Sequence, residues 1–357
     1  SALPSAAARH SILACDPVAV LRGGPETLAK LRAELAARAR AGVPGLPFSG
    51  GAIGYLGYEY GAALDGVAPA AAAPGDPALP DLAFGLYDSA VVHDHLTGET
   101  HLVAPDAAAL AALRALVASA PAPSAPSFAV GPLRADLSPE AYASALARIR
   151  DYIAAGDTYQ VNFTHRFTAP FSGSAAALHA RLRALSPAPH AAFLDFGDFQ
   201  VVSSTPERLL RVAGRDLETR PIKGTIARLA DPVADAAHRA RLLASAKDHA
   251  ELLMIVDLAR NDLGRVAAAG SVHVAERHAL ETYATVHHLV ATVRAELAPG
   301  LDRFDALRAL HPGGSITGAP KIRAMQIIAE LEPAREYEET RHKGRAMHQA
   351  LQPRPGL

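Results

Sequence analysis

The stretch AAFLDFGDFQVVSSTPERLLRVAGRDLETRPIKGT, residues 191–225, decides the fold. It contains short apolar or alternating runs bounded by turn residues, which predict strands at 191–196, 199–203, 209–212 and 216–219. The turns Gly197-Asp198 and Gly214-Arg215 separate the strands of two pairs. Successive hairpins of this kind favour an antiparallel sheet.

Strands are also predicted before this stretch, and helices after it. Residues 159–167 alternate apolar and polar side chains, which predicts the clearest strand of the chain. After Asp231 the pattern predicts mainly long helices, among them 247–262, with one shorter strand around 271–274. Strands followed by helices indicate an α+β fold rather than a repeated βαβ unit.

The composition divides the chain into three parts. Residues 1–120 predict an N-terminal α/β subregion, with a helix at 28–41 and strands at 49–58, 86–92 and 100–103. An Ala/Ser/Pro-rich run predicts a connector at 121–137. The third part, 138–357, opens with Ser138-Pro139-Glu140, an N-cap, a proline and an acid that together predict a helix start.

The bulk composition excludes several classes of protein. Lys and Arg total 35 and Asp and Glu 36, a net charge of -1 that gives no electrostatic footprint for nucleic acid or an anionic membrane. No apolar run approaches the roughly 18 residues of a membrane span. The single Cys15 excludes an internal disulfide and a multi-cysteine metal site, and fits a cytoplasmic protein. The first residues, Ser1-Ala2-Leu3-Pro4, show no signal peptide and no Met, which fits a sequence that begins inside a longer chain.

The pentapeptide Pro221-Ile222-Lys223-Gly224-Thr225 is the first candidate for chemistry. Lys223 stands where a strand is predicted to end, and Gly224 lets a ligand or another backbone approach closely. A lysine in such a place is a nucleophile if its surroundings favour the free amine. The alternative is a surface lysine that extends into solvent.

Two pairs of carboxylates have the i, i+3 spacing that places both on one helix face. Asp248 and Glu251 lie in the helix predicted at 247–262, and Glu336 and Glu339 lie near the C-terminus. Facing each other, they would suit a hard divalent cation, most plausibly Mg²⁺. Taken singly, each pair fits an ordinary solvated helix surface.

Three further features suit a site, and each has a structural alternative. The Gly-rich loop at 313–321 leads into a helix, where free backbone N–H groups attract a carboxylate or phosphate, or where a plain turn ends. His287-His288 follows Tyr283 in an apolar run that we interpret as helical, and a buried, hydrogen-bonded histidine is the default interpretation. Glu207 lies in a turn between strands, either as a catalytic acid or as an exposed acid paired with Arg208. The polar run 257–265 indicates a structural network.

Together these stretches resemble the chorismate-utilising enzymes, the family of anthranilate, aminodeoxychorismate, isochorismate and salicylate synthases. The resemblance runs from about His10 to Lys343 through motifs at 156–162, 207, 221–225, 251–265, 283–290 and 311–332. It implies an α+β fold of curved antiparallel sheets packed together with helices outside.

Two positions discriminate within the family. Isochorismate and salicylate synthases typically carry a lysine where this chain has Gln160, and anthranilate synthases typically carry an alanine where it has Lys223. The sequence Pro-Ile-Lys-Gly-Thr is similar to aminodeoxychorismate synthase component I. That resemblance implies conversion of chorismate and ammonia to 4-amino-4-deoxychorismate, for p-aminobenzoate and folate synthesis.

The resemblance also implies roles for single residues. Lys223 would attack C2 of chorismate while Glu207 assists departure of the C4 hydroxyl, and His288 would lie near the reacting ring. The substrate would be bound with the help of Gly224, Thr225, Thr317, Gly318 and Lys343. Mg²⁺ would be bound mainly by Glu251 and Glu339, with Asp248 and Glu336 as outer or water-mediated partners.

The sequence departs from the family after Pro333. A strand-rich segment that supplies substrate contacts is expected there, but Leu331-Glu332-Pro333-Ala334 leads directly into a run resembling the family's last helix. We interpret this as a segment omitted from the sequence. No glutaminase domain is recognisable, so nitrogen would come from free ammonia or from a separate glutamine amidotransferase subunit. Two alternatives follow: an anthranilate synthase component I, or a catalytically impaired subunit that only docks a glutaminase.

Overall fold

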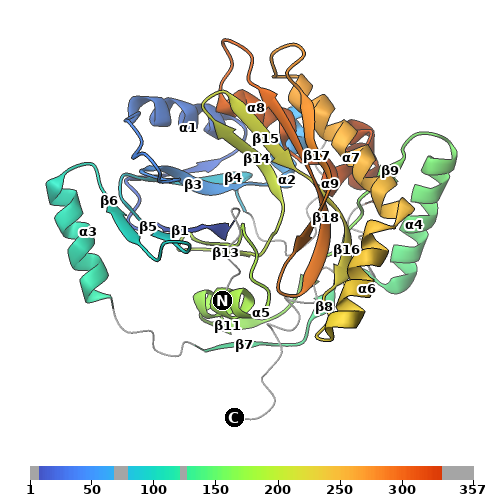
Figure 1. Cartoon of the computed structure of the whole chain (residues 1–357), viewed down its shortest axis with the longest axis horizontal. Coiled ribbons are helices and arrows are strands. Elements are labelled where there is room, and N and C mark those ends of the chain that lie inside the picture. The colour runs from blue at the N-terminus through green and yellow to red at the C-terminus, as the bar shows by residue number, and fades with distance from the viewer. Residues whose placement is uncertain (1–7, 68–78, 121–126, 332–357) are drawn as a thin grey trace.

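The computed structural model describes residues 8–67, 79–120 and 127–331. In Figure 1 the N-terminal strands lie on the left and the strands of residues 208–296 on the right, with helices α4, α6 and α7 beyond them. Every strand pairing in these ranges is antiparallel. The prediction of an α+β fold is confirmed.

A five-stranded sheet dominates the right half. Its strands are β14 (Arg208–Ala213), β15 (Asp216–Arg220), β16 (Ile222–Ala227), β17 (His273–Thr282) and β18 (Val286–Glu296). β15 and β16 follow each other along one edge of β18, with Pro221 between them, and β17 also pairs with β18. The predicted hairpins are confirmed in β14–β15 and in β12 (Ala192–Asp195) with β13 (Gln200–Ser203).

The central strand β18 corrects one prediction. His287 and His288 were expected in a helix, but they lie in the strand β18. The strand expected around 271–274 is present, but it is the longer β17 and it pairs with β18. Residues 287–293 of β18 are all buried, so the strand contains an uninterrupted buried run instead of an alternation. Such a run cannot be told from a buried helix by periodicity alone.

Two helices cover this sheet and carry part of the site. α6 (Pro232–Leu243) and α7 (Ala246–Gly264) supply Leu242, Leu252 and Val256 to a buried cluster. The strands supply Leu217, Leu289, Ala291 and Val293 to the same cluster. The predicted helix at 247–262 is confirmed, and its buried face points at the sheet.

Two three-stranded sheets form the N-terminal half. One has the order β2 (Ala19–Gly23), β4 (Leu82–Tyr87), β3 (Gly51–Leu56), and the other the order β1 (His10–Leu13), β5 (Ala90–Asp94), β6 (Thr100–Val103). The helices are α1 (Glu26–Ala37), α2 (Tyr58–Leu64) and α3 (Ala107–Ser119). The strand predicted at 86–92 is in fact divided between β4 and β5. Phe304 of α8 (Arg303–Leu310) packs in one cluster with Leu28, Leu82 and Leu86, which joins the two halves.

The segment between the halves corrects a second prediction. Residues 159–167 contain only the short strands β9 (Gln160–Val161) and the start of β10 (Phe167–Thr168). Tyr159 is 74% exposed while Phe163 is 1% exposed, so the alternating residues do not share one buried face. The other short strands are β7 (Phe128–Val130), β8 (Arg134–Ala135) and β11 (Phe171–Gly173).

Helices α4 (Pro139–Ala154) and α5 (Ala175–Leu185) flank this segment. The predicted cap of α4 is confirmed, because the Ser138 hydroxyl oxygen accepts a hydrogen bond from the backbone N–H of Ala141.

The described chain ends with α9 (Gly314–Thr317), β19 (Gly318–Ala319) and α10 (Lys321–Leu331). In α10 Ile322 is exposed, whereas Ile327 is fully buried. Among the helices of the described ranges, none is both long enough and apolar enough to cross a bilayer.

Candidate active site

A β-bulge places Lys223 at the centre of the candidate site. Between the pairs Ile222↔Val290 and Thr225↔His288, two residues of β16 stand against one of β18. Gly224 has a φ of +83°, a conformation that favours glycine. A Cβ on Gly224 would lie 2.9 Å from the Cβ of Asp248 and 3.1 Å from Leu242 Cδ1. α6 and α7 therefore pack directly on the bulge.

Lys223 is buried, with 9% of the residue exposed. Its Nζ donates a hydrogen bond to the carbonyl oxygen of Ser315, 3.4 Å away. The alternative of a lysine extended into solvent is therefore wrong, and the amine points at the Gly-rich loop instead.

Glu207, the residue directly before β14, also contacts this loop. Its Oε1 accepts a hydrogen bond from the Ser315 hydroxyl at 2.5 Å and from the Ile222 backbone N–H at 3.4 Å. Arg208, which the alternative interpretation paired with Glu207, donates to Glu218. Ser315 thus contacts Lys223 through its carbonyl and Glu207 through its hydroxyl.

Ser315 was not predicted as a site residue, although it contacts two residues that were. It lies inside the Gly-rich loop at 313–321, which was selected for its backbone N–H groups and not for its hydroxyl. A loop serine next to a candidate acid in space cannot be recognised from spacing, because the two residues are 108 positions apart.

A cavity of about 200 Å³ adjoins Glu207 and Ser315. Its walls combine apolar and ionisable side chains, among them Leu209, Ile255, Ala259, Asp262, Leu310, His311 and Ile316. Lys223 is not among these lining residues, but its amine contacts the carbonyl oxygen of Ser315, which is one of them. The carboxylate of Glu207 therefore borders a cavity close to the buried amine of Lys223.

His288 is fixed beside the bulge. Its Nδ1 lies 2.8 Å from the Thr225 hydroxyl, and its ring centre lies 5.4 Å from that of Tyr283, in an edge-on arrangement. Burial lowers the pKa of His288 to about 4, so the ring is neutral at pH 7. His287 is fully buried between Thr282 and Asp235, at 2.9 and 2.8 Å, which makes it a structural histidine.

Thr317 and Gly318 hold the Gly-rich loop against β9. The Thr317 hydroxyl donates to the Gly313 carbonyl at 3.1 Å, and a Cβ on Gly318 would lie 2.1 Å from the carbonyl oxygen of Gln160. Their contacts with substrate stay a prediction, as do those of Gly224 and Thr225.

The predicted metal ligands are only partly within the described residues. Asp248 and Glu251 lie one turn apart on α7, with Glu251 also 3.6 Å from Lys247 Nζ. Glu336, Glu339 and Lys343 lie outside the described ranges. Within those ranges, no group of three or more His, Cys, Asp or Glu side chains could hold a metal ion. The two carboxylates nevertheless fit Mg²⁺, which often binds one or two protein carboxylates and takes its other oxygen ligands from water and substrate.

A buried ion pair in the wall of the cavity was not predicted from the sequence. Lys321 Nζ of α10 donates to Asp262 Oδ2 of α7 at 2.6 Å, and both side chains are 6% exposed. Burial raises the pKa of Asp262 to about 6, against the attraction of Lys321. The polar run 257–265 was interpreted as a structural network, and this pair is its buried part.

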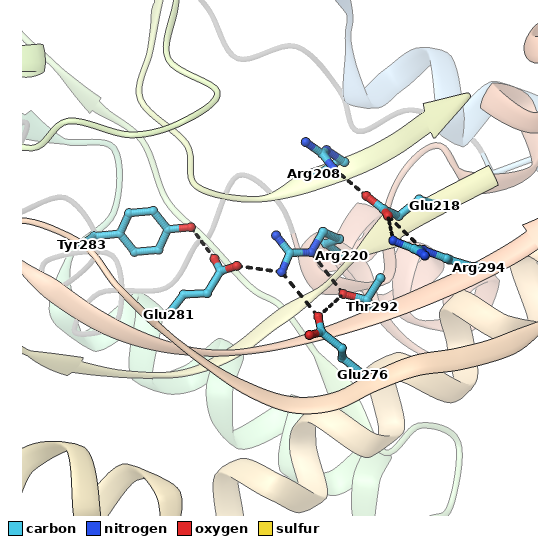
Figure 2. A network of polar contacts seen from close by, with 8 residues as sticks. All are labelled: Arg208, Glu218, Arg220, Glu276, Glu281, Tyr283, Thr292 and Arg294. Carbon is cyan, nitrogen blue, oxygen red and sulfur yellow. Dashed lines mark hydrogen bonds and ion pairs between the residues drawn. The ribbon is translucent and has the colours of Figure 1, made fainter. Parts of the chain in front are cut away.

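A network of eight residues lies on β14, β15, β17 and β18 and in the turn after β17 (Figure 2). Arg208 and Arg294 both donate to Glu218. Arg220 donates to Glu281 at 2.6 Å and to Thr292 at 3.1 Å, and the Tyr283 hydroxyl donates to Glu281 at 2.5 Å. The remaining member, Glu276, accepts from Thr292 at 3.0 Å.

Comparison with known proteins gives concordant matches. A family model described as chorismate binding enzyme matches residues 4–337. Aminodeoxychorismate synthase component 1 of Klebsiella aerogenes is 47% identical over 295 residues, which cover 82% of this chain and 64% of that protein. Anthranilate synthase component 1 of Streptomyces coelicolor is 40% identical over 351 residues, which cover 91% of this chain and 68% of that protein.

The fold has solved counterparts. The crystal structure of anthranilate synthase component I from Streptococcus pneumoniae matches with a TM-score of 0.79 and 31% identity, over 93% of this chain and 79% of that one. In sequence, the part of this chain that aligns with the aminodeoxychorismate synthase relative from Klebsiella aerogenes spans 64% of the length of that relative.

Proposed function

Because the chain belongs to the family of chorismate-binding enzymes, we propose that it is the chorismate-converting component of an aminodeoxychorismate synthase. The observation that carries this proposal is Lys223, buried on a glycine bulge beside Glu207 in the sequence Pro-Ile-Lys-Gly-Thr. Relatives that are 43–47% identical and bear the name aminodeoxychorismate synthase component 1 support it.

The proposed chemistry uses two side chains, those of Lys223 and Glu207. The Lys223 amine attacks C2 of chorismate while the C4 hydroxyl leaves as water, with its proton supplied by Glu207. Ammonia then attacks C4 and displaces the amine from C2, which returns Lys223 and gives 4-amino-4-deoxychorismate. Ser315 holds Glu207 and Lys223 in register, and the neutral His288 lies at the edge of the bulge.

Mg²⁺ is part of the proposal. Asp248 and Glu251 of α7 would hold it, together with Glu336 and Glu339 from outside the described residues. When bound, the ion supplies positive charge that holds the ring carboxylate of the substrate.

The proposal includes a partner. The relatives are named component 1, which implies a second component for those proteins. We propose that a separate glutamine amidotransferase subunit delivers ammonia to this chain, and that the complex works in the cytoplasm in p-aminobenzoate and folate synthesis.

Anthranilate synthase component I is the second candidate. It is favoured by the Streptomyces coelicolor relative, which is aligned to 91% of this chain, and by the Streptococcus pneumoniae structure. Lys223 is the residue that argues against it, since the anthranilate synthases typically carry alanine there.

Product identification with the full-length protein that contains this sequence tests the proposal. The protein is incubated with chorismate, ammonium and Mg²⁺, and a lyase is added to convert aminodeoxychorismate to p-aminobenzoate. We expect p-aminobenzoate, and we expect Lys223→Ala to lower its rate about 10³-fold or more. Lys30→Ala, on the exposed face of α1, is the matched control and should leave the rate unchanged.

Two outcomes would contradict the proposed aminodeoxychorismate synthase activity. Anthranilate as sole product would establish the second candidate. Chorismate binding without turnover would favour the third alternative, a subunit that only docks a glutaminase.

A further inference from the structure

The starting observation is how the ring of His288 is held. Thr225 of β16 fixes its Nδ1, and the ring of Tyr283, in the turn between β17 and β18, packs on it edge-on. The orientation of Tyr283 depends in turn on its hydroxyl, which donates to Glu281 Oε2 at 2.5 Å (Figure 2). Glu281 is also the partner of His288 across β17 and β18, and its charge acts on the imidazole directly. The same carboxylate therefore influences His288 both by its charge and through the ring of Tyr283.

Glu281 is itself fixed from the other side. Arg220 Nη2 donates to Glu281 Oε1 at 2.6 Å, and Arg220 Nε donates to the Thr292 hydroxyl at 3.1 Å. Arg220 is the last residue of β15, and β16 with Lys223 begins two positions later. A chain of contacts therefore runs from Arg220, just before the strand of Lys223, through Glu281 and Tyr283 to His288.

The network is better suited to positioning than to binding a ligand. It contains three guanidinium groups and three carboxylates, so its formal charges cancel. Each carboxylate accepts from an arginine or from a hydroxyl within the network, including Glu276, which accepts from Thr292. An anion would have to displace these internal partners, at the cost of leaving a carboxylate unpaired.

We propose that Glu281 is a positioning residue for the reaction at Lys223, holding His288 through Tyr283 and the start of β16 through Arg220. This rests on the proposed function only in that His288 and Lys223 act on chorismate. The geometric part of the proposal, the fixed orientation of the His288 ring, is independent of the substrate.

Glu276, another carboxylate of the network, provides a control variant. The side chains of Glu281 and Arg220 are 24% and 19% exposed, whereas Glu276, at the outer end, is 57% exposed. Glu276 contacts Thr292 and Arg220 but not Tyr283 in the network of Figure 2. Glu276→Gln therefore changes the same kind of charge on the same sheet without cutting the path to His288.

Two variants cut the path with little change in shape. Tyr283→Phe keeps the ring against His288 and removes only the hydroxyl. Glu281→Gln keeps the size of the side chain and removes its charge, which weakens its hydrogen bonds from both Arg220 and Tyr283. If either variant fails to fold, as judged by circular dichroism, the other carries the test.

The first measurement is steady-state kinetics with chorismate and ammonium. We expect both variants to lower kcat about tenfold with KM for chorismate within about twofold of the wild type, since a misplaced group costs rate more than binding. Glu276→Gln should leave kcat within about twofold. Unchanged kcat in both path variants, or an equal fall in Glu276→Gln, would overturn the proposal.

The second measurement is the imidazole ¹⁵N spectrum of the free protein. The signals of His288 are identified among those of 16 histidines by their loss in His288→Gln. Tyr283→Phe and Glu281→Gln should shift them, and Glu276→Gln should not. Tyr283→Phe is the decisive variant, because it keeps the charge of Glu281 beside His288. Signals of His288 that stay in place in Tyr283→Phe would refute the positioning role. This arm needs no turnover, so a wild type without product would reject the proposed function while the spectrum still decides the positioning role.

Discussion

Two buried carboxylates, Asp262 and Glu218, are paired with cations in different ways. Asp262 has one close partner, Lys321, at 2.6 Å. Glu218 accepts three hydrogen bonds from the guanidinium groups of Arg208 and Arg294. Burial raises the pKa of Asp262 to about 6 in spite of Lys321. For Glu218 burial acts in the same direction, but the hydrogen bonds from Arg294 and Arg208 outweigh it and its pKa is lowered.

The two carboxylates differ in the number of charged donors that oppose the effect of burial. One ammonium group does not compensate for the lost hydration of Asp262, whereas two planar guanidinium groups compensate for that of Glu218. The two pairings also lie in different places. Asp262, in the cavity wall, joins helix α7 to Lys321 of α10, and Glu218 joins the strands β14, β15 and β18. We therefore expect the single pair to be the more fragile of the two.

The largest effect is expected for Lys321→Met. It leaves Asp262 buried without its cation, and breaking a buried pair from one side costs about 3–5 kcal/mol of unfolding free energy. The measurement is urea unfolding at pH 7. The double variant Asp262→Leu/Lys321→Met replaces both charges with apolar groups and should recover most of the loss. A single variant as stable as the wild type would mean that Lys321 does not stabilise Asp262.

The pH dependence of stability gives the next largest effect. The pKa of Asp262 rises from 3.8 in the unfolded chain to about 6 in the folded one. Its contribution to stability is therefore complete below pH 3.8 and is lost as the pH rises through about 6. From pH 4 to 7 the unfolding free energy of the wild type should fall by about 2–3 kcal/mol relative to the double variant. Parallel curves for the two proteins would contradict the raised pKa.

The lowered pKa of Glu218 has the opposite consequence. Its contribution is present above the unfolded value of 4.5 and is lost as the pH falls below it. His288 behaves similarly, because its pKa is lowered: its contribution is complete above 6.5 and is lost as the pH falls towards about 4. Only Asp262 of these three groups destabilises the protein on the alkaline side, which makes the pH profile a direct test of the difference between the two pairings.

Part of the fold could be predicted because local sequence determines it. The turns Gly197-Asp198 and Gly214-Arg215 mark hairpins, and Ser138 caps a helix through its own side chain. The long strand β18 could not be predicted, since it is buried on both faces and shows no alternation. The strand predicted at 159–167 is absent as a continuous element. Within the described residues, its segment β9 pairs with the two residues Gly318 and Ala319 and no others.

The candidate site divides in the same way. Lys223 and Gly224 could be selected because their neighbours in sequence are also their neighbours in the bulge. Ser315 and Glu207 are 108 positions apart, and Lys321 and Asp262 are 59 apart, so their contacts depend on how the loop and helices pack. No spacing rule predicts such pairs. The family resemblance supplied roles for single residues, but not the contacts that hold them.

The smallest effect is expected for Arg294→Gln, and it tests the comparison most sharply. The side chain of Arg294 is 56% exposed, and Glu218 keeps its 2.6 Å hydrogen bond from Arg208 when Arg294 is changed. Exposed ion pairs contribute little, so the loss should stay below about 1 kcal/mol in the same urea assay. A loss as large as that of Lys321→Met would mean that Glu218 needs both arginines, and that the number of donors does not make its pairing more robust. A small loss of unfolding free energy in Arg294→Gln, together with a large one in Lys321→Met, would show that the contact between α7 and α10, in the wall of the cavity, is the more easily destabilised of the two.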